Sequence, residues 1–212
     1  MTGVATFADL AAEVLARPPR VGQVRVVAVD GPAGSGKTTF TGRLVAALRT
    51  AGASVGQVSV DDVRNGWSDI ADWWPWFRTS VLSDLRSGRS GWYRRYDWAT
   101  GRHAGDPVAV AAVDVLVLDG VGSASAGAAD ELTLTVWIAA ADPGLRLRRL
   151  VERDGEPLRP DLQRWMAAEE AHFVTDRTAR RADVRVDGAP AVAHDPSVQY
   201  VRSTGRWTVL RR

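Results

Sequence analysis

A nine-residue segment, Gly31 to Thr39, constrains the fold of this chain more than any other feature. Its first eight residues, G-P-A-G-S-G-K-T, match the whole pattern G-x-x-x-x-G-K-[ST] of a phosphate-binding loop. The glycines let successive backbone N–H groups turn inward and surround phosphate oxygens. The β-branched run Val24–Val29 precedes the loop and a helical pattern over about 37–50 follows it, so a chance glycine-rich turn is the weaker interpretation.

Lys37 and Thr38 are the reactive side chains of this loop. Lys37 is placed to contact the β- and γ-phosphates of ATP during catalysis, and the Thr38 hydroxyl is placed to bind Mg²⁺. Lys37 is the only lysine among 27 basic residues, and a planar guanidinium does not replace its compact charge. The predicted contacts to the nucleotide are Gly31, Ala33, Gly34, Ser35, Gly36, Lys37, Thr38, Thr39 and, from a later helix, Arg146.

Strand-like runs alternate with helical patterns along the chain, which predicts an α/β fold with a five-stranded parallel sheet and helices on both faces. A phosphate-binding loop on such a sheet indicates the P-loop NTPase fold. We expect a single domain over residues 1–212, with a C-terminal β-hairpin over Gln199–Arg211. The predicted strands are Val24–Val29, Ala53–Val60, Val113–Leu118, Leu132–Ile138 and Asp183–Val186, and the predicted helices cover about 5–16, 37–50, 143–153 and 160–180.

Three aspartates follow predicted strands at the edge of the sheet where the loop lies. Asp119 ends an apolar strand and is the candidate that holds Mg²⁺, directly or through water, with Asp61 as a further candidate ligand. Asp61 or Asp62 is also placed to accept the proton of an attacking hydroxyl. The alternative for this pair is a solvated acidic turn or a helix N-cap.

An arginine-rich segment over about 143–160 is the candidate lid. Arg146, Arg149 and Arg153 recur at intervals of three and four residues, so they share one helix face. Guanidinium groups on a closing lid stabilise the charge of a transferring phosphoryl group, and we assign Arg149 and Arg153 to this catalytic role. The alternative is a solvated cationic face, which the neighbouring acidic residues would balance.

An aromatic segment over about 63–106 lies between the second and third strands and holds six of the nine tryptophans. This position is the carboxyl edge of the sheet, where ligands bind in open α/β folds. We expect part of the segment to contact the acceptor while most of its tryptophans pack in a core. The predicted acceptor contacts are Asp61, Asp62, Trp67, Arg94, Tyr96 and Asp97.

Composition argues against several other classes of protein. The net charge is +2 with no basic tail, so we expect no nucleic-acid partner. No uncharged apolar stretch approaches the roughly 18 residues that span a bilayer, and the N-terminal segment lacks the pattern of a signal peptide. We therefore expect no membrane partner and a cytoplasmic location. Cysteine is absent, which removes disulfides and thiolate chemistry.

The ordered set of motifs resembles the uridine kinase branch of the P-loop kinases, which also includes phosphoribulokinase and pantothenate kinase. The resemblance covers most of residues 24–187, and more narrowly the chain resembles uridine kinase-like proteins of actinobacteria. It rests on G-P-A-G-S-G-K-T-T at 31–39, V-D-D at 60–62, Y-D at 96–97, V-L-D-G at 117–120, R-L-R-R-L-V-E-R-D at 146–154 and Phe173 followed by Ala182 and Asp183.

This resemblance implies that Asp61 is the catalytic base and that Tyr96 and Asp97 lie in a nucleoside site. It also implies a homo-oligomer, because members of the family often form dimers or tetramers. The chain departs from the family pattern at Val63 and Arg64, where the family has aromatic residues. It departs again at Asp119, where the family mostly has glutamate, and at His103, which lies six residues after Asp97 rather than four.

We therefore predict an ATP- and Mg²⁺-dependent kinase of a small molecule, with a uridine- or cytidine-like nucleoside as the first candidate for the acceptor. A sugar, a vitamin precursor or a nucleotide is the second candidate, and Arg94 and Arg95 would suit an acceptor that already carries phosphate. A nucleotide-binding regulator with slow ATPase activity is the alternative from another class of protein.

Overall fold

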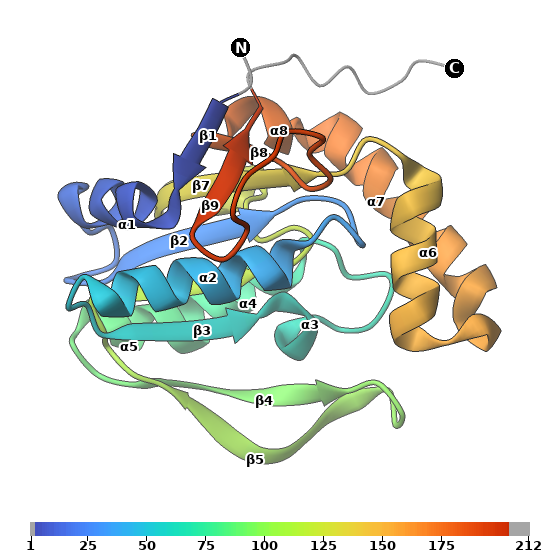
Figure 1. Cartoon of the computed structure of the whole chain (residues 1–212). Helices are drawn as coiled ribbons and strands as arrows, with labels where there is room; N and C mark the ends of the chain where they lie inside the picture. Colours follow the sequence, from blue (N-terminus) through green and yellow to red (C-terminus); the bar gives the residue numbers. More distant parts are fainter. Residues whose placement is uncertain (1–2, 204–212) are drawn as a thin grey trace.

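The computed structural model describes residues 3–203, which form one seven-stranded sheet and a separate two-stranded sheet. The strand order in the large sheet is β1-β9-β8-β7-β2-β6-β3 (Figure 1). The five strands from β8 to β3 are parallel, whereas β9 pairs antiparallel with β8, and β1 pairs antiparallel with β9. These strands are β1 (Gly3–Thr6), β2 (Arg25–Asp30), β3 (Val55–Ser59), β6 (Val115–Asp119), β7 (Leu132–Ala139), β8 (Val184–Asp187) and β9 (Gln199–Arg202).

The prediction of a five-stranded sheet is wrong, because two further strands, β9 and β1, extend the five parallel ones. β1 has only four residues and directly precedes the first helix, so it shows no alternation of apolar and polar residues from which a strand could be predicted. Gln199–Arg202 forms a strand as expected, but it pairs with β1 along its length and meets β8 at Arg202. The predicted second arm of the C-terminal hairpin follows Ser203 and lies outside the described residues.

Helices cover both faces of the sheet, as predicted. Apolar side chains on α1 and α2 pack with Val27 and Val29 of β2, whereas Val26 and Ala28 of the same strand face the helices of the aromatic segment. This double burial explains why the central strands β2 and β6 are apolar at nearly every position. The helices are α1 (Phe7–Ala16), α2 (Lys37–Thr50), α3 (Val60–Val63), α4 (Trp73–Phe77), α5 (Ser83–Arg86), α6 (Pro143–Asp154), α7 (Arg159–Asp176) and α8 (Thr178–Arg181).

The helix predicted over 160–180 is divided in two. Arg177 adopts a left-handed backbone conformation with φ of 57°, which ends α7 and begins the short α8. Figure 1 places α6 and α7 together at one end of the molecule, next to the carboxyl edge of the parallel strands. None of the helices within residues 3–203 is long and apolar enough to cross a membrane.

The aromatic segment contains short helices and a hairpin of β4 (Gly91–Asp97) and β5 (Arg102–Val110), which pair with each other in the second sheet. Trp73 and Trp74 on α4 are 1% and 2% exposed and belong to the core. The other four tryptophans of the segment retain between 39% and 53% of their surface. The segment therefore serves both as core and as exposed aromatic surface, although the sequence did not predict its hairpin.

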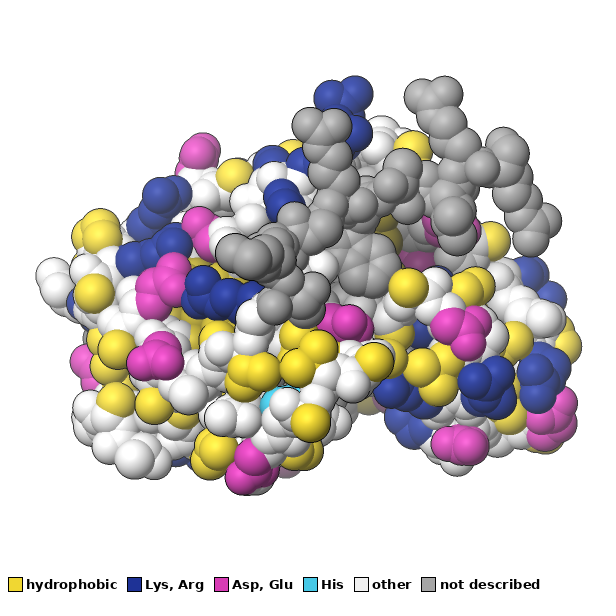
Figure 2. Space-filling view, turned by 45° about the horizontal axis from the view of Figure 1, so that its top comes forward, with side chains coloured by type: hydrophobic (Ala, Val, Ile, Leu, Met, Phe, Trp, Pro, Cys, Tyr) yellow, Lys and Arg dark blue, Asp and Glu magenta, His cyan; other side chains and the backbone are white. Residues whose placement is uncertain are grey.

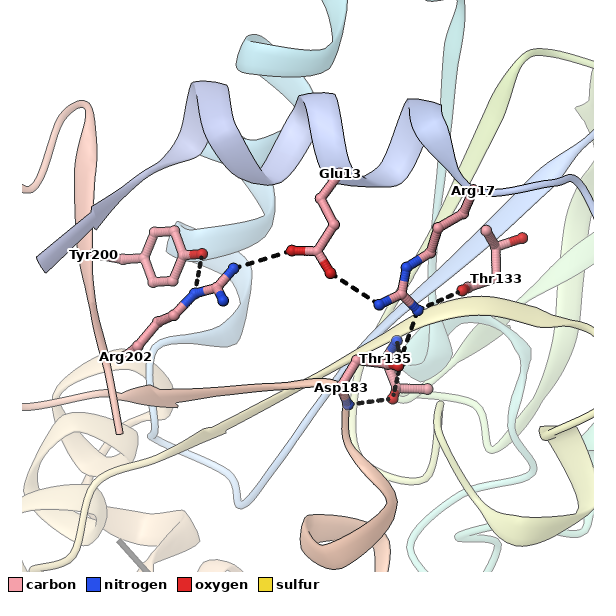
Figure 3. Close-up of polar contacts among 7 residues, drawn as sticks. All are labelled: Glu13, Arg17, Thr133, Thr135, Asp183, Tyr200 and Arg202. Carbon is pink, nitrogen blue, oxygen red and sulfur yellow. Dashed lines mark hydrogen bonds and ion pairs between the residues drawn. The ribbon is translucent and has the colours of Figure 1, made fainter. Parts of the chain in front are cut away.

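A polar network links α1 to the ends where β7 and β8 begin and to β9 (Figure 3). The Arg17 guanidinium donates hydrogen bonds to Glu13 Oε1 at 2.8 Å, to Asp183 Oδ1 at 2.9 Å and to the Thr133 carbonyl at 3.1 Å. Arg202 on β9 donates to the second oxygen of Glu13 at 3.1 Å. One carboxylate thus links a helix to the last described strand of the sheet.

Candidate active site

A cavity of about 550 Å³ opens at the carboxyl edge of the parallel strands, between the phosphate-binding loop, α3, α6 and α7. It brings together residues that are far apart in sequence because the ends of β2, β3 and β6 meet at this edge. Among the predicted site residues, those that line the cavity are Ala33, Gly34, Gly36, Lys37, Thr38, Thr39, Asp61, Trp67, Asp119, Arg149 and Arg153. Gly31, Ser35, Asp62, Arg94, Tyr96, Asp97 and Arg146 do not line it.

The loop is held in a conformation that requires glycine. Gly31 has φ of 142°, and a Cβ atom there would lie 1.9 Å from the carbonyl oxygen of Ile138. Gly36 has φ of 98° and directly precedes α2, so the positive end of that helix faces the cavity. Lys37 Nζ donates hydrogen bonds to the carbonyl oxygens of Gly31 at 2.7 Å and of Pro32 at 3.0 Å. The ammonium therefore lies over the loop, in reach of phosphates bound there.

Two buried carboxylates that the sequence analysis missed support this loop. Asp30 accepts hydrogen bonds from the N–H groups of Gly31 at 2.7 Å, Gly122 at 3.0 Å and Ala124 at 2.9 Å. Burial raises the pKa of Asp30 to about 6, although these bonds act in the opposite direction. Its position between an apolar strand and the loop is the sequence signal that could have identified it.

Glu169 on α7 is the second supporting carboxylate and is 1% exposed. It accepts a hydrogen bond from the Ala33 N–H at 2.8 Å and pairs with Arg146 at 2.9 Å. Burial raises its pKa, while Lys37, Ala33 and Arg146 act to lower it. No local pattern marks Glu169, because its contact with the loop depends on how α7 packs.

Asp119 has the properties of a magnesium ligand. Its side chain is buried at the end of β6, and Oδ1 has no hydrogen-bond partner within the described part of the chain. Burial raises its pKa, while the Lys37 charge and the Thr38 hydroxyl act to lower it. Residues 3–203 contain no cluster of three or more acidic or histidine side chains suited to a metal. One carboxylate beside the Thr38 hydroxyl is a donor set that fits Mg²⁺, which binds through one or two protein oxygens together with phosphate oxygens and water.

Asp61 and Asp62 point to different surroundings although both belong to α3. Asp61 lines the cavity, retains half of its side-chain surface and pairs with Arg64 at 2.9 Å. Asp62 contacts the hairpin instead, with the Tyr93 hydroxyl at 3.5 Å and Arg95 at 3.3 Å. Burial is the main cause that raises the pKa of Asp62. Of the two, Asp61 is the carboxylate that shares the cavity with the phosphate-binding loop.

The arginines of α6 divide between holding the loop and facing the cavity. Arg146 pairs with Glu169, and Arg149 donates hydrogen bonds to the carbonyls of Gly34 at 3.1 Å and Gly188 at 3.2 Å. Arg153 lines the cavity and pairs with Asp154 at 2.7 Å. Figure 2 shows basic side chains gathered over the right-hand part of the molecule, where Figure 1 places α6, with acidic groups among them.

Three tryptophans and an arginine form one cluster in the lining of the cavity. The Arg64 guanidinium lies over the rings of Trp98 and Trp165, with its central carbon 5.1 Å and 4.1 Å from the ring centroids. Trp67 contacts both of these rings edge-on, at centroid distances of 5.1 Å and 5.7 Å. Arg64, Trp98 and Trp165 come from three separate segments, and none of them is among the predicted site residues.

The remaining predicted acceptor contacts lie elsewhere. Arg94 lines a second cavity of about 520 Å³ between α4 and the hairpin. Tyr96 packs against Trp98 and His103 at centroid distances of 5.1 Å and 5.4 Å. The Asp97 carboxylate accepts hydrogen bonds from the N–H groups of the next turn, at 2.9 Å from Ala99 and 3.3 Å from Thr100.

Comparison with known proteins identifies the fold. No family model matches the chain, and no curated protein matches it. Among solved structures, one described as a possible uridine kinase from Bacillus stearothermophilus matches with a TM-score of 0.61 and 22% identity over 84% of this chain and 96% of that chain. Another, whose assignment is likewise provisional, is a fructose transport system kinase from Silicibacter sp. TM1040, with a TM-score of 0.51 and 21% identity over 84% and 95% of the two chains. The chain shares the mostly parallel α/β fold of these two proteins.

Proposed function

We propose that this protein is an ATP-dependent kinase that phosphorylates a hydroxyl group of a small molecule. The observation that carries the proposal is the placement of Asp61 in one cavity with Lys37, Thr38 and Asp119. A phosphate-binding loop alone would serve any nucleotide-binding protein. A further carboxylate in the same cavity, half of whose side-chain surface is exposed, supplies the base that transfer to an acceptor requires.

The reaction follows from these positions. The acceptor oxygen attacks the γ-phosphorus of ATP, the bond from that phosphorus to the bridging oxygen breaks, and Asp61 takes the hydroxyl proton. Lys37 and the loop N–H groups bind the phosphates, and Arg153 faces the group in transfer. Mg²⁺, held by Thr38 and Asp119, would neutralise charge on the β- and γ-phosphate oxygens.

The acceptor has two candidates within this function. A nucleoside is supported by the likeness to the possible uridine kinase and by the exposed tryptophans in the cavity. A sugar is supported by the likeness to the fructose transport system kinase. It is also supported by the Arg64 guanidinium, which already lies over the rings of Trp98 and Trp165, where a nucleobase would stack. A nucleotide-binding regulator would have no use for the acceptor side of the cavity.

Acceptor-dependent release of ADP from Mg-ATP tests the proposal across nucleosides, nucleotides, sugars and vitamin precursors. We expect one class to stimulate release, and we expect Lys37→Ala and Asp61→Asn to abolish the stimulation. Arg49→Ala, a change at an exposed position in the last turn of α2, serves as the control. Tight ATP binding without stimulation by any acceptor would contradict the kinase function and favour a regulator.

A further inference from the structure

Arg64 is a feature of the cavity that the proposed chemistry does not use. Its side chain is only 4% exposed, although it belongs to the wall where an acceptor would bind. Trp98 comes from the hairpin tip and Trp165 from α7, and the Arg64 guanidinium lies over both rings. Two separate parts of the fold thus converge on one flat cation.

The stability of the fold does not account for this arrangement. Arg64 pairs with Asp61, but its Nε and Nη1 groups have no hydrogen-bond partner within residues 3–203. Burial lowers the pKa of Arg64 despite the nearby charges of Asp61, Asp69 and Glu169. A buried charged group with unpaired donors destabilises a protein, so another advantage must come from its position.

The shape of the guanidinium suggests that advantage. A guanidinium is planar and stacks on aromatic faces, as a nucleobase does. Aromatic faces in a binding cavity are a common means of holding a base by stacking. Arg64 therefore covers, from within the chain, ring faces of Trp98 and Trp165 on which a nucleobase would otherwise stack. A nucleoside that stacked on these faces would have to displace Arg64 and break its pair with Asp61, the proposed catalytic base.

We propose that Arg64 covers the ring faces of Trp98 and Trp165 and thereby restricts the acceptor to a non-aromatic polyhydroxylated molecule of the sugar class. The inference rests on the proposed kinase function and selects one of its two acceptor classes. Trp67 and Trp98 remain 42% and 39% exposed, which leaves indole surface for the apolar side of a sugar ring. Asp154 and Arg153 also line the cavity and offer an acceptor and donors for further hydroxyl groups.

The test compares the use of acceptors by three proteins, each assayed with Mg-ATP: the wild type, Arg64→Ala and the control Arg89→Ala. Arg89 suits the control because it is 65% exposed and lies outside the cavity lining. The acceptors are uridine and cytidine, against glucose, fructose, ribose and glycerol. We expect the wild type and Arg89→Ala to use a sugar or polyol in preference to both nucleosides. We expect kcat/KM for uridine to rise at least about tenfold in Arg64→Ala, the effect of one lost clash or gained stack. A wild type that prefers a nucleoside overturns the proposal.

A binding measurement separates this inference from the kinase function. Equilibrium dialysis with labelled uridine, in the presence of Mg²⁺ and a non-hydrolysable ATP analogue, needs no turnover. If no acceptor is phosphorylated but Arg64→Ala binds uridine at least tenfold more tightly than the wild type, the kinase function is contradicted and the exclusion of nucleobases by Arg64 is supported. Equal affinity of the two proteins for uridine, tight or weak, contradicts the exclusion of nucleobases by Arg64. If Arg64→Ala does not bind the ATP analogue, Arg64→Lys takes its place in this comparison of uridine affinities, because lysine keeps the charge but not the planar group.

Discussion

Arg17 and Arg64 meet their surroundings in opposite ways, at opposite ends of the sheet. Arg17 donates to three protein oxygens and is 31% exposed, and these pairs raise its pKa although burial alone would lower it. Arg64 is 4% exposed, has one carboxylate partner and two unpaired donors, and burial lowers its pKa. An arginine that serves the fold lies where its donors are satisfied. An arginine that shapes a site can lie where they are not.

The largest expected effect separates the acidic partners of these two arginines. Asp61→Asn should lower kcat for the acceptor by roughly 10²- to 10⁴-fold, because the amide cannot take the hydroxyl proton. Glu13→Gln, the matched change beside Arg17, should leave kcat unchanged, because Glu13 lies on α1 and does not line the cavity. Steady-state ADP release measures both. Full activity in Asp61→Asn with loss in Asp62→Asn would transfer the role of base to Asp62.

Two carboxylates, Asp30 beside the phosphate-binding loop and Asp183 beside Arg17, should make contributions to stability that change with pH in opposite directions. Burial raises the pKa of Asp30 to about 6, so its contribution to stability is complete below the ordinary pKa and falls as pH rises to 6, by on the order of 3 kcal/mol. Burial alone would raise the pKa of Asp183, but the bonds from Arg17 and Thr135 outweigh it and lower the pKa. Its contribution is therefore present above the ordinary pKa and is lost as pH falls further.

Urea unfolding between about pH 2.5 and 7 measures these dependences. Asp30→Asn should remove the decline in unfolding free energy between about pH 4 and 6 that the wild type owes to Asp30. Asp183→Asn should instead weaken the loss of stability on the acidic side. Identical pH profiles for the wild type and Asp30→Asn would show that Asp30 titrates alike in the folded and unfolded chains.

Replacing each arginine by methionine should separate stability from specificity. Arg17→Met removes bonds to two carboxylates and a carbonyl and should lower the unfolding free energy by about 1–3 kcal/mol. Arg64→Met places an apolar chain between two indole rings and should change it by less than about 1 kcal/mol, because replacing a buried charge by an apolar group is often neutral. Thermal denaturation checks both variants. A larger loss for Arg64→Met would mean that Arg64 serves the fold after all.

The smallest effect sets the baseline for these comparisons. Arg89 pairs with Asp84 at 2.7 Å, but its side chain is 65% exposed and that of Asp84 is 36% exposed. Water screens such a pair, so Arg89→Ala should lower the unfolding free energy by less than about 1 kcal/mol and leave acceptor use unchanged. A loss equal to that of Arg17→Met would contradict the distinction drawn between exposed and networked arginines.

The sequence predicts those parts of the molecule that leave a local pattern. The phosphate-binding loop and the five parallel strands follow from short motifs and apolar runs, and the gathering of strand ends places Lys37, Asp61 and Asp119 in one cavity. Glu169 and Trp165 escape prediction because they reach the site through the packing of α7. β1 escapes because its pairing partner is β9, almost the whole length of the chain away.

That pairing has a consequence for the order in which the protein is made. Gly3–Thr6 leaves the ribosome before every other described strand, but Gln199–Arg202, with which it pairs, is among the last described residues to follow. Until then β8 presents an unpaired edge, and unpaired edges recruit strands from other chains. A chain that folds before β9 is in place would therefore expose the edge of β8 to edge-to-edge aggregation.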